Sequence, residues 1–108
     1  MKQFPAKEVM GFMEPFNVKI GYGSNEVTLT ILPAGENYYK VIYYGAIIGA
    51  VKYDIDSWEL VPLEEVEAGD LPFYRHDVNS GKVNVVMNEA TADEIGEEIN
   101  HYYHKEED

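Results

Sequence analysis

The sequence predicts an α+β domain, an antiparallel β-meander of about four to six strands with a C-terminal α-helix packed on one face. Three observations support this fold class. Apolar and polar residues alternate from residue 16 onward, turn-forming residues separate the alternating runs, and a capping sequence near the C-terminus precedes an apolar stripe with helical spacing. The length of 108 residues fits a single domain spanning residues 1–108.

The first two strands are indicated by strict alternation. Phe16, Val18, Ile20 and Tyr22 alternate with polar or glycine residues, and Val27 to Ile31 repeats the pattern with β-branched residues. Gly, Ser and Asn at residues 23–25 form a turn between them. A second turn is expected at residues 33–37, so these strands form a hairpin that leads into the next one.

Tyr38 to Tyr44 and Ile47 to Tyr53 are predicted to be the two arms of a tight hairpin. Gly45-Ala46 fits a two-residue type II′ turn, which takes Gly at its first central position. That register places Tyr44 opposite Ile47 and leaves Gly49 as a gap for a neighbouring aromatic ring. It also gathers one set of apolar side chains on a single face, which we interpret as the candidate interaction surface: Tyr39, Val41, Tyr43 and Ile48.

Four further segments have weaker patterns. Trp58 to Val61 is predicted to be a fifth strand, and Pro62 to Gly69 one or two helical turns. Lys82 to Met87 alternates and is predicted to be a last strand. Pro5 to Met13 is predicted to be a short N-terminal helix, because Pro suits the first helical position.

The C-terminal helix carries the clearest local signals. Thr91 and Glu94 form a capping box, in which Thr91 caps the helix and Glu94 reaches back to it. One arc of the helix is apolar and should pack on the sheet: Ala92, Ile95, Ile99, Tyr102 and Tyr103. Gly96 lies at the edge of this arc, where it predicts a close approach of helix to sheet. Residues 105–108 are expected to be a frayed acidic tail.

The formal net charge of −12 lies entirely in the second half of the chain. Residues 1–55 carry five lysines and five acids, whereas residues 56–108 carry fifteen acids against three basic side chains. Such a surface repels phosphates and anionic lipid, so we expect neither nucleic acid nor a membrane as partner. Clustered carboxylates would instead suit solubility, a basic partner, or imitation of nucleic acid.

The absence of cysteine excludes disulfides, thiolate metal sites and cysteine nucleophiles. The first residues lack the uninterrupted apolar run of a signal peptide, and no apolar stretch has the length of a membrane span. A soluble, cytoplasmic protein is therefore expected.

Motifs for chemistry are sparse. Glu97, His101 and His104 share one side of the predicted helix and form a weak candidate metal site, but this side points away from the apolar stripe, so no metal or cofactor is predicted. No phosphate-binding loop or nucleophile motif is present, and His76 beside Asp77 is a common chance pairing. We therefore expect no catalytic residues and favour a non-enzymatic protein.

Three functions follow in order of support. The first is an interaction or accessory module that forms a homodimer, or binds another protein, through its Tyr-rich sheet face. The second is a small enzyme or ligand binder with a pocket between sheet and helix. The third is an acidic nucleic-acid mimic that inhibits a basic partner.

Overall fold

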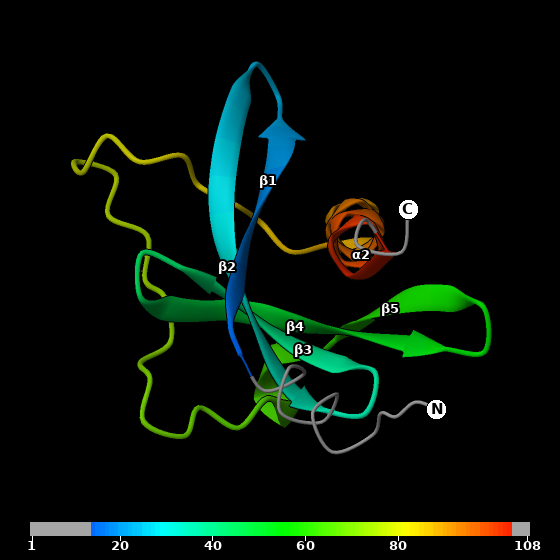
Figure 1. Cartoon of the computed structure of the whole chain (residues 1–108). Helices are drawn as coiled ribbons and strands as arrows, with labels where there is room; N and C mark the ends of the chain where they lie inside the picture. Colours follow the sequence, from blue (N-terminus) through cyan, green and yellow to red (C-terminus); the bar gives the residue numbers. More distant parts are fainter. Residues whose placement is uncertain (1–13, 105–108) are drawn as a thin grey trace.

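The computed structural model describes residues 14–104, and it confirms the predicted α+β class. Five antiparallel strands form one sheet in the order β1-β2-β3-β4-β5, and a helix packs against it (Figure 1). The predicted helix at Pro5 to Met13 and the tail at 105–108 lie outside the described residues. The elements are β1 (Phe16–Tyr22), β2 (Asn25–Gly35), β3 (Tyr38–Tyr43), β4 (Ala46–Asp54), β5 (Ser57–Val61), the 3-10 turn η1 (Leu63–Glu65) and α2 (Glu89–His104).

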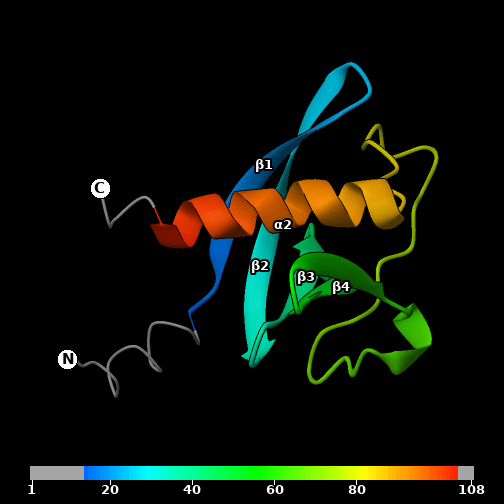
Figure 2. The same ribbon diagram turned by 90° about the vertical axis from the view of Figure 1, so that its right-hand side faces the viewer.

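The sheet is curled, and α2 lies in the angle that the curl creates. Figure 1 shows the helix end-on between the β1–β2 hairpin and strands β3 to β5, and Figure 2 shows it crossing in front of the sheet. The helix contacts β5, β1 and β4, so it bridges the two edge strands of the meander. At one of these edges the Glu94 carboxylate accepts a hydrogen bond of 2.9 Å from the Gly21 backbone N–H.

The main core lies between the sheet and α2. Ala92, Ile95 and Ile99 are at most 1% exposed, which confirms the predicted apolar stripe. They pack on alternate residues of the strands, such as Leu29, Ile31, Val41 and Val51. Tyr102, which was predicted to belong to this stripe, is exposed at 37% and stacks on Phe16, with ring centroids 3.8 Å apart and ring planes 4° from parallel.

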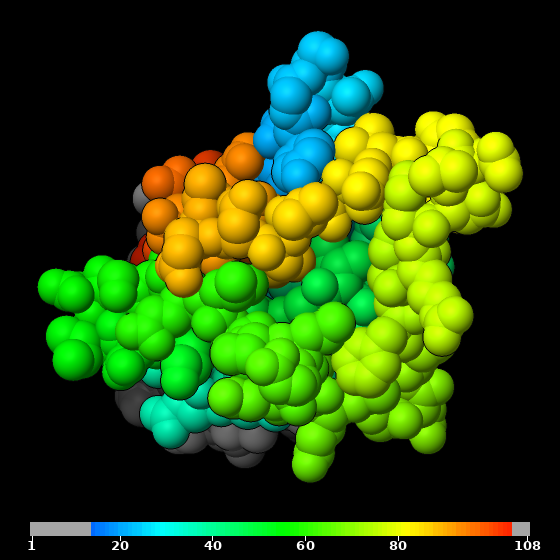
Figure 3. All heavy atoms as spheres, turned by 180° about the vertical axis from the view of Figure 1, so that it is seen from behind, coloured from blue at the N-terminus to red at the C-terminus, as the bar shows by residue number. Residues whose placement is uncertain are grey.

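The opposite face of β3 to β5 is closed by the chain that follows β5. A second cluster there comprises Ile42, Ile47, Ala50, Val61 and Val66. The segment also extends the sheet, since the Ile47 N–H donates to the Pro72 carbonyl and the Tyr74 N–H donates to the Ile47 carbonyl, each at 2.8 Å. Figure 3 shows this segment, coloured green to yellow, running along the outside of the molecule towards α2. The second face of these strands is therefore covered by the chain's own loop.

The predicted register of the β3–β4 hairpin is wrong. The turn is Tyr44-Gly45, one residue earlier than expected, and both residues have positive φ, at 50° and 78°. Two positive φ values fit a type I′ turn, whose twist matches that of the flanking strands. Tyr43 consequently pairs with Ala46, and a register shift after Val41 makes Tyr38 pair with Lys52. The prediction failed because Gly45 occupies the second position of the turn.

The predicted strand at Lys82 to Met87 does not pair with the sheet. Its alternation is real, since Val83, Val85 and Met87 face inward. Its backbone is held instead by tyrosine hydroxyls: the Val86 N–H donates to the Tyr22 hydroxyl at 2.9 Å, and the Tyr43 hydroxyl donates to the Val83 carbonyl at 2.8 Å. Met87, rather than an aromatic ring, fills the gap over Gly49.

The cap of helix α2 lies three residues before the predicted one. The Asn88 side-chain oxygen accepts hydrogen bonds from the Thr91 N–H at 2.9 Å and from its hydroxyl at 3.0 Å, so Asn88 is the cap and Thr91 lies inside the first turn. Glu94 bonds to β1 instead of reaching back. Among residues 14–104, no helix is both long and apolar enough to cross a membrane.

Gly96 is required by the contact between α2 and β5, which confirms the predicted close approach. A Cβ atom at this position would overlap the indole ring of Trp58. Although Ala favours a helix over Gly by about 1 kcal/mol, we expect Gly96→Ala to lower the free energy of unfolding by about 1–3 kcal/mol because of overpacking. Urea unfolding measures the change.

Gly21→Ala is the matched control for this prediction. A Cβ at Gly21 meets only the Glu94 carboxylate at an ordinary distance of 3.8 Å, so the change should have an effect below about 0.5 kcal/mol. A Gly96→Ala protein as stable as the parent would contradict the role of this contact.

Candidate functional site

The predicted interaction surface lies in the core. Tyr39, Val41 and Tyr43 are 7%, 0% and 3% exposed, and they pack with Ile95 and Ile99 of α2. Ile48 is partly buried against the same cluster. This assignment is therefore corrected: the Tyr-rich face of the hairpin is the one that the helix covers.

The predicted metal-ligand candidates do not form a site. Within the described part of the chain, no group of three or more His, Asp or Glu side chains is arranged to hold a metal ion. Glu97 and His101 are exposed on the outer side of α2. His104, by contrast, lines a pocket between helix and sheet.

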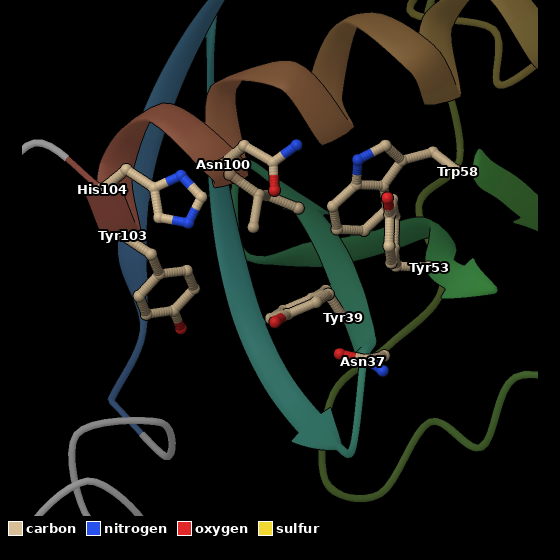
Figure 4. A pocket seen from close by; sticks show the side chains of 8 residues that line it. Asn37, Tyr39, Tyr53, Trp58, Asn100, Tyr103 and His104 are labelled. Atoms are coloured by element: carbon tan, nitrogen blue, oxygen red, sulfur yellow. The ribbon is translucent and has the colours of Figure 1, made fainter. Parts of the chain in front are cut away.

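This pocket is the candidate functional site. Its volume is about 250 Å³, and it lies where the last two turns of α2 pass over the ends of β3, β4 and β5 (Figure 4). The helix contributes residues at i, i+1, i+4 and i+5, which share one face. The lining residues are Asn37, Tyr39, Tyr53, Trp58, Ile99, Asn100, Tyr103 and His104.

Four aromatic rings form the walls of the pocket. Trp58 is central on the sheet side, with its ring centroid 5.1 Å from that of Tyr53 and 5.7 Å from that of Tyr39. Tyr39 in turn lies 6.3 Å from Tyr103 of the helix, at an interplanar angle of 44°. These spacings are typical of favourable aromatic pairs. The result is a continuous aromatic wall that runs from β4 to α2.

The rim of the pocket is formed by polar side chains. Asn37, Asn100 and His104 are all exposed. Asn37 has a positive φ of 56°, and its carbonyl accepts a hydrogen bond of 2.8 Å from the Tyr53 N–H, which fixes the β2–β3 turn beside the pocket. No Lys, Arg, Asp or Glu is among the lining residues.

Two polar atoms of the lining residues are buried without a hydrogen-bond partner among the described residues. They are the indole Nε1 of Trp58 and the hydroxyl of Tyr103. Each unpaired buried donor costs about 1–3 kcal/mol, and most buried polar atoms in folded proteins have partners. Both atoms belong to residues that line the pocket, so a ligand whose acceptor atoms reached them would gain hydrogen bonds that the described residues do not make.

Two tyrosines of the pocket, Tyr39 and Tyr103, are held in their neutral form. Burial, with smaller contributions from Tyr39 and Tyr102, raises the pKa of Tyr103 to about 12. Burial also raises the pKa of Tyr39. The phenols are therefore hydrogen-bonding groups at neutral pH, and the surroundings disfavour a negative charge.

Sequence reasoning found the type of site only as an alternative. A pocket between sheet and helix was one of the alternatives, without assigned lining residues. His76 is not among the residues that line it, and its Nδ1 lies 3.4 Å from the Tyr74 hydroxyl. Tyr53 and Trp58 are paired across the β4–β5 turn. One signal for this site was available in the sequence. It was a glycine at the edge of the apolar face of the helix, which indicates a close contact with a neighbouring strand.

Comparisons with known proteins give no further guidance. No family model, no curated protein and no solved structure matches this chain. Function is therefore argued from the pocket itself.

Removal of the Tyr103 hydroxyl should not destabilise the unliganded protein. Tyr103→Phe keeps the ring and removes an unpaired buried group, so we expect a free energy of unfolding equal to the parent's or up to about 1 kcal/mol higher. Tyr43→Phe is the control, because its hydroxyl donates to the Val83 carbonyl at 2.8 Å. That change should cost about 1–3 kcal/mol. Equal losses in urea unfolding of the two variants would show that Tyr103 has a partner.

Stability should fall at alkaline pH. A phenol in the unfolded chain titrates near pH 10, whereas Tyr103 in the folded protein titrates at about 12. Between these values the unfolded state binds fewer protons than the folded state, so the free energy of unfolding decreases as pH rises. Urea unfolding at pH 8 and at pH 11 measures the loss, which Tyr103→Phe should reduce. A loss of the same size in this variant would contradict the assignment.

Proposed function

We propose that this protein is a non-enzymatic binding module whose ligand enters the aromatic pocket between sheet and helix. The observation that carries the proposal is that one pocket is lined by four aromatic side chains, two of which carry a buried donor without a partner among the described residues. Apolar walls with a few convergent polar groups are the usual composition of a ligand site.

The chemistry of the lining residues favours binding over catalysis. General acid–base catalysis needs a group whose pKa lies near the working pH. The raised pKa of Tyr103 and of Tyr39 keeps both phenols protonated at neutral pH, so neither is available to accept a proton. No carboxylate is among the lining residues, and the imidazole of His104 is exposed at the rim, so the aromatic walls themselves offer hydrogen-bond donors and π faces.

The electrostatics favour a neutral or cationic ligand. An anion would find no Lys or Arg among the lining residues, in a chain whose net charge is −12. The volume of about 250 Å³ is below the roughly 300–1,000 Å³ of sites for drug-sized ligands. The pocket therefore suits a small molecule or one or two residues of a larger partner.

Self-association through the Tyr-rich face is replaced in this proposal, because that face is buried under α2. A cytoplasmic location is retained as part of the proposal, since a chain without cysteine needs no oxidising compartment.

The single tryptophan provides a direct test. Its indole N–H gives one NMR signal, and this signal reports on the pocket. We expect neutral compounds with acceptor oxygens, such as N-methylacetamide and N-acetylpyrrolidine, to shift it at millimolar concentration. Benzoate, an anion, should not.

Two variants control the experiment. Tyr53→Ala removes one wall of the pocket and should abolish the shifts, whereas Tyr44→Ala removes an exposed tyrosine outside the pocket and should leave them unchanged. If no neutral compound moves the Trp58 signal, the pocket is only a packing feature and the proposal is wrong.

A further inference from the structure

We infer that the ligand of the pocket is a proline-rich peptide segment in the polyproline II conformation, flanked by basic residues. The inference rests on the proposed function and names the class of its ligand. It draws on three features of the site: the type of its unpartnered polar groups, its aromatic walls and the charge beside it.

A ligand that pairs with the two unpartnered groups must supply hydrogen-bond acceptors. The indole N–H of Trp58 can only donate, and the hydroxyl of Tyr103 is free to donate. Proline has a carbonyl oxygen and no N–H, so a run of prolines presents acceptors without donors. Such a segment can pair with these groups without introducing unpaired donors of its own.

The aromatic walls suit proline rings. Trp58, Tyr53 and Tyr39 form a rigid apolar surface, and Tyr103 closes it from the helix side. Proline-rich segments dock in aromatic-lined grooves in this way, and their preformed conformation reduces the entropy lost on binding. The volume of about 250 Å³ limits the buried part to about one or two residues.

The charge beside the pocket is acidic. Asp54 and Asp56 are exposed in the turn that joins Tyr53 to Trp58, and Glu36 is exposed directly before Asn37. Glu36 and Asp54 adjoin lining residues in the chain, and Asp56 is two residues from Trp58. Lys or Arg residues next to the prolines would therefore be attracted to this side of the molecule.

Two other ligand types match less of the site. A small organic cation would use the π faces but would leave both donors unpaired. A sugar would supply acceptors, but its hydroxyl groups also donate, and the amide oxygens of Asn37 and Asn100 that could receive them are at the exposed rim, away from the two buried donors. Both are included as outcomes of the test below.

Binding requires a small movement of the pocket. Neither the Trp58 nitrogen nor the Tyr103 hydroxyl is reached by solvent in this structure. A carbonyl that pairs with them must displace a ring as it enters, and side-chain rearrangements of this kind are common at interfaces. The indole N–H signal should therefore change strongly on binding.

The test titrates the full chain with an end-blocked peptide of six prolines flanked by one arginine on each side. We expect a saturable shift of the Trp58 indole signal. The same peptide with glutamate flanks should bind about tenfold more weakly at low salt, because the nearby carboxylates repel it. A peptide with alanines in place of the prolines should give no saturable shift.

Variants locate the contact. Tyr53→Ala should weaken binding about tenfold, as expected for an aromatic anchor, with Tyr53→Leu as the second variant if the first fails to fold. Tyr103→Phe should weaken it about fivefold by removing one donor. Tyr44→Ala, outside the pocket, should bind like the parent.

Several results would overturn the inference. Equal binding of the alanine peptide, or binding unaffected by Tyr53→Ala and Tyr53→Leu, would do so. If tetramethylammonium or methyl glucoside shifts the Trp58 signal saturably while the proline peptide does not, the pocket is a binding site but its ligand class is wrong. If no compound shifts it, the proposed function fails together with the inference.

Discussion

The contact between Trp58 and Gly96 is the constraint on which the rest of the structure depends. The indole ring lies against the helix backbone so closely that a single Cβ would overlap it. This contact sets the distance between α2 and β5, and thereby the position of the last two helical turns above the sheet. Ile99 then reaches the core, and Tyr103 is placed opposite Tyr39. The pocket is thus a direct result of how one glycine and one tryptophan meet.

Two tyrosine hydroxyls form hydrogen bonds to a backbone segment that has no neighbouring strand within residues 14–104 to pair with. The hydroxyls of Tyr22 and Tyr43 bond to the backbone of residues 83–86, which would otherwise need a neighbouring strand. In both cases the phenol hydroxyl has a backbone partner. The hydroxyl of Tyr103 departs from that pattern among the described residues. This contrast distinguishes the pocket, because burying its donors costs free energy that no hydrogen bond offsets.

Much of the fold followed from local sequence, whereas the site did not. The strands and the apolar stripe of α2 were predictable because alternation and helical spacing are properties of neighbouring residues. The register of β3 and β4 was not, because it depends on which two residues around Gly45 form the turn and on an irregularity between Val41 and Ile42. Val41 therefore pairs with Gly49 rather than with Ala50. The pocket depends on Asn37, Trp58 and Tyr103, which are distant in the chain. Gly96 was the one feature of the local sequence that indicated a close contact between the helix and the sheet.

The sequential order of the strands has a kinetic consequence. Each strand pairs with its neighbour in the chain, so the sheet can assemble by short loop closures. The helix comes last in sequence and contacts both β1 and β5, and closing those contacts spans most of the chain. Half of the pocket belongs to this helix. We therefore expect the site to form in the final folding step, and a ligand held there would slow the release of the helix from the sheet.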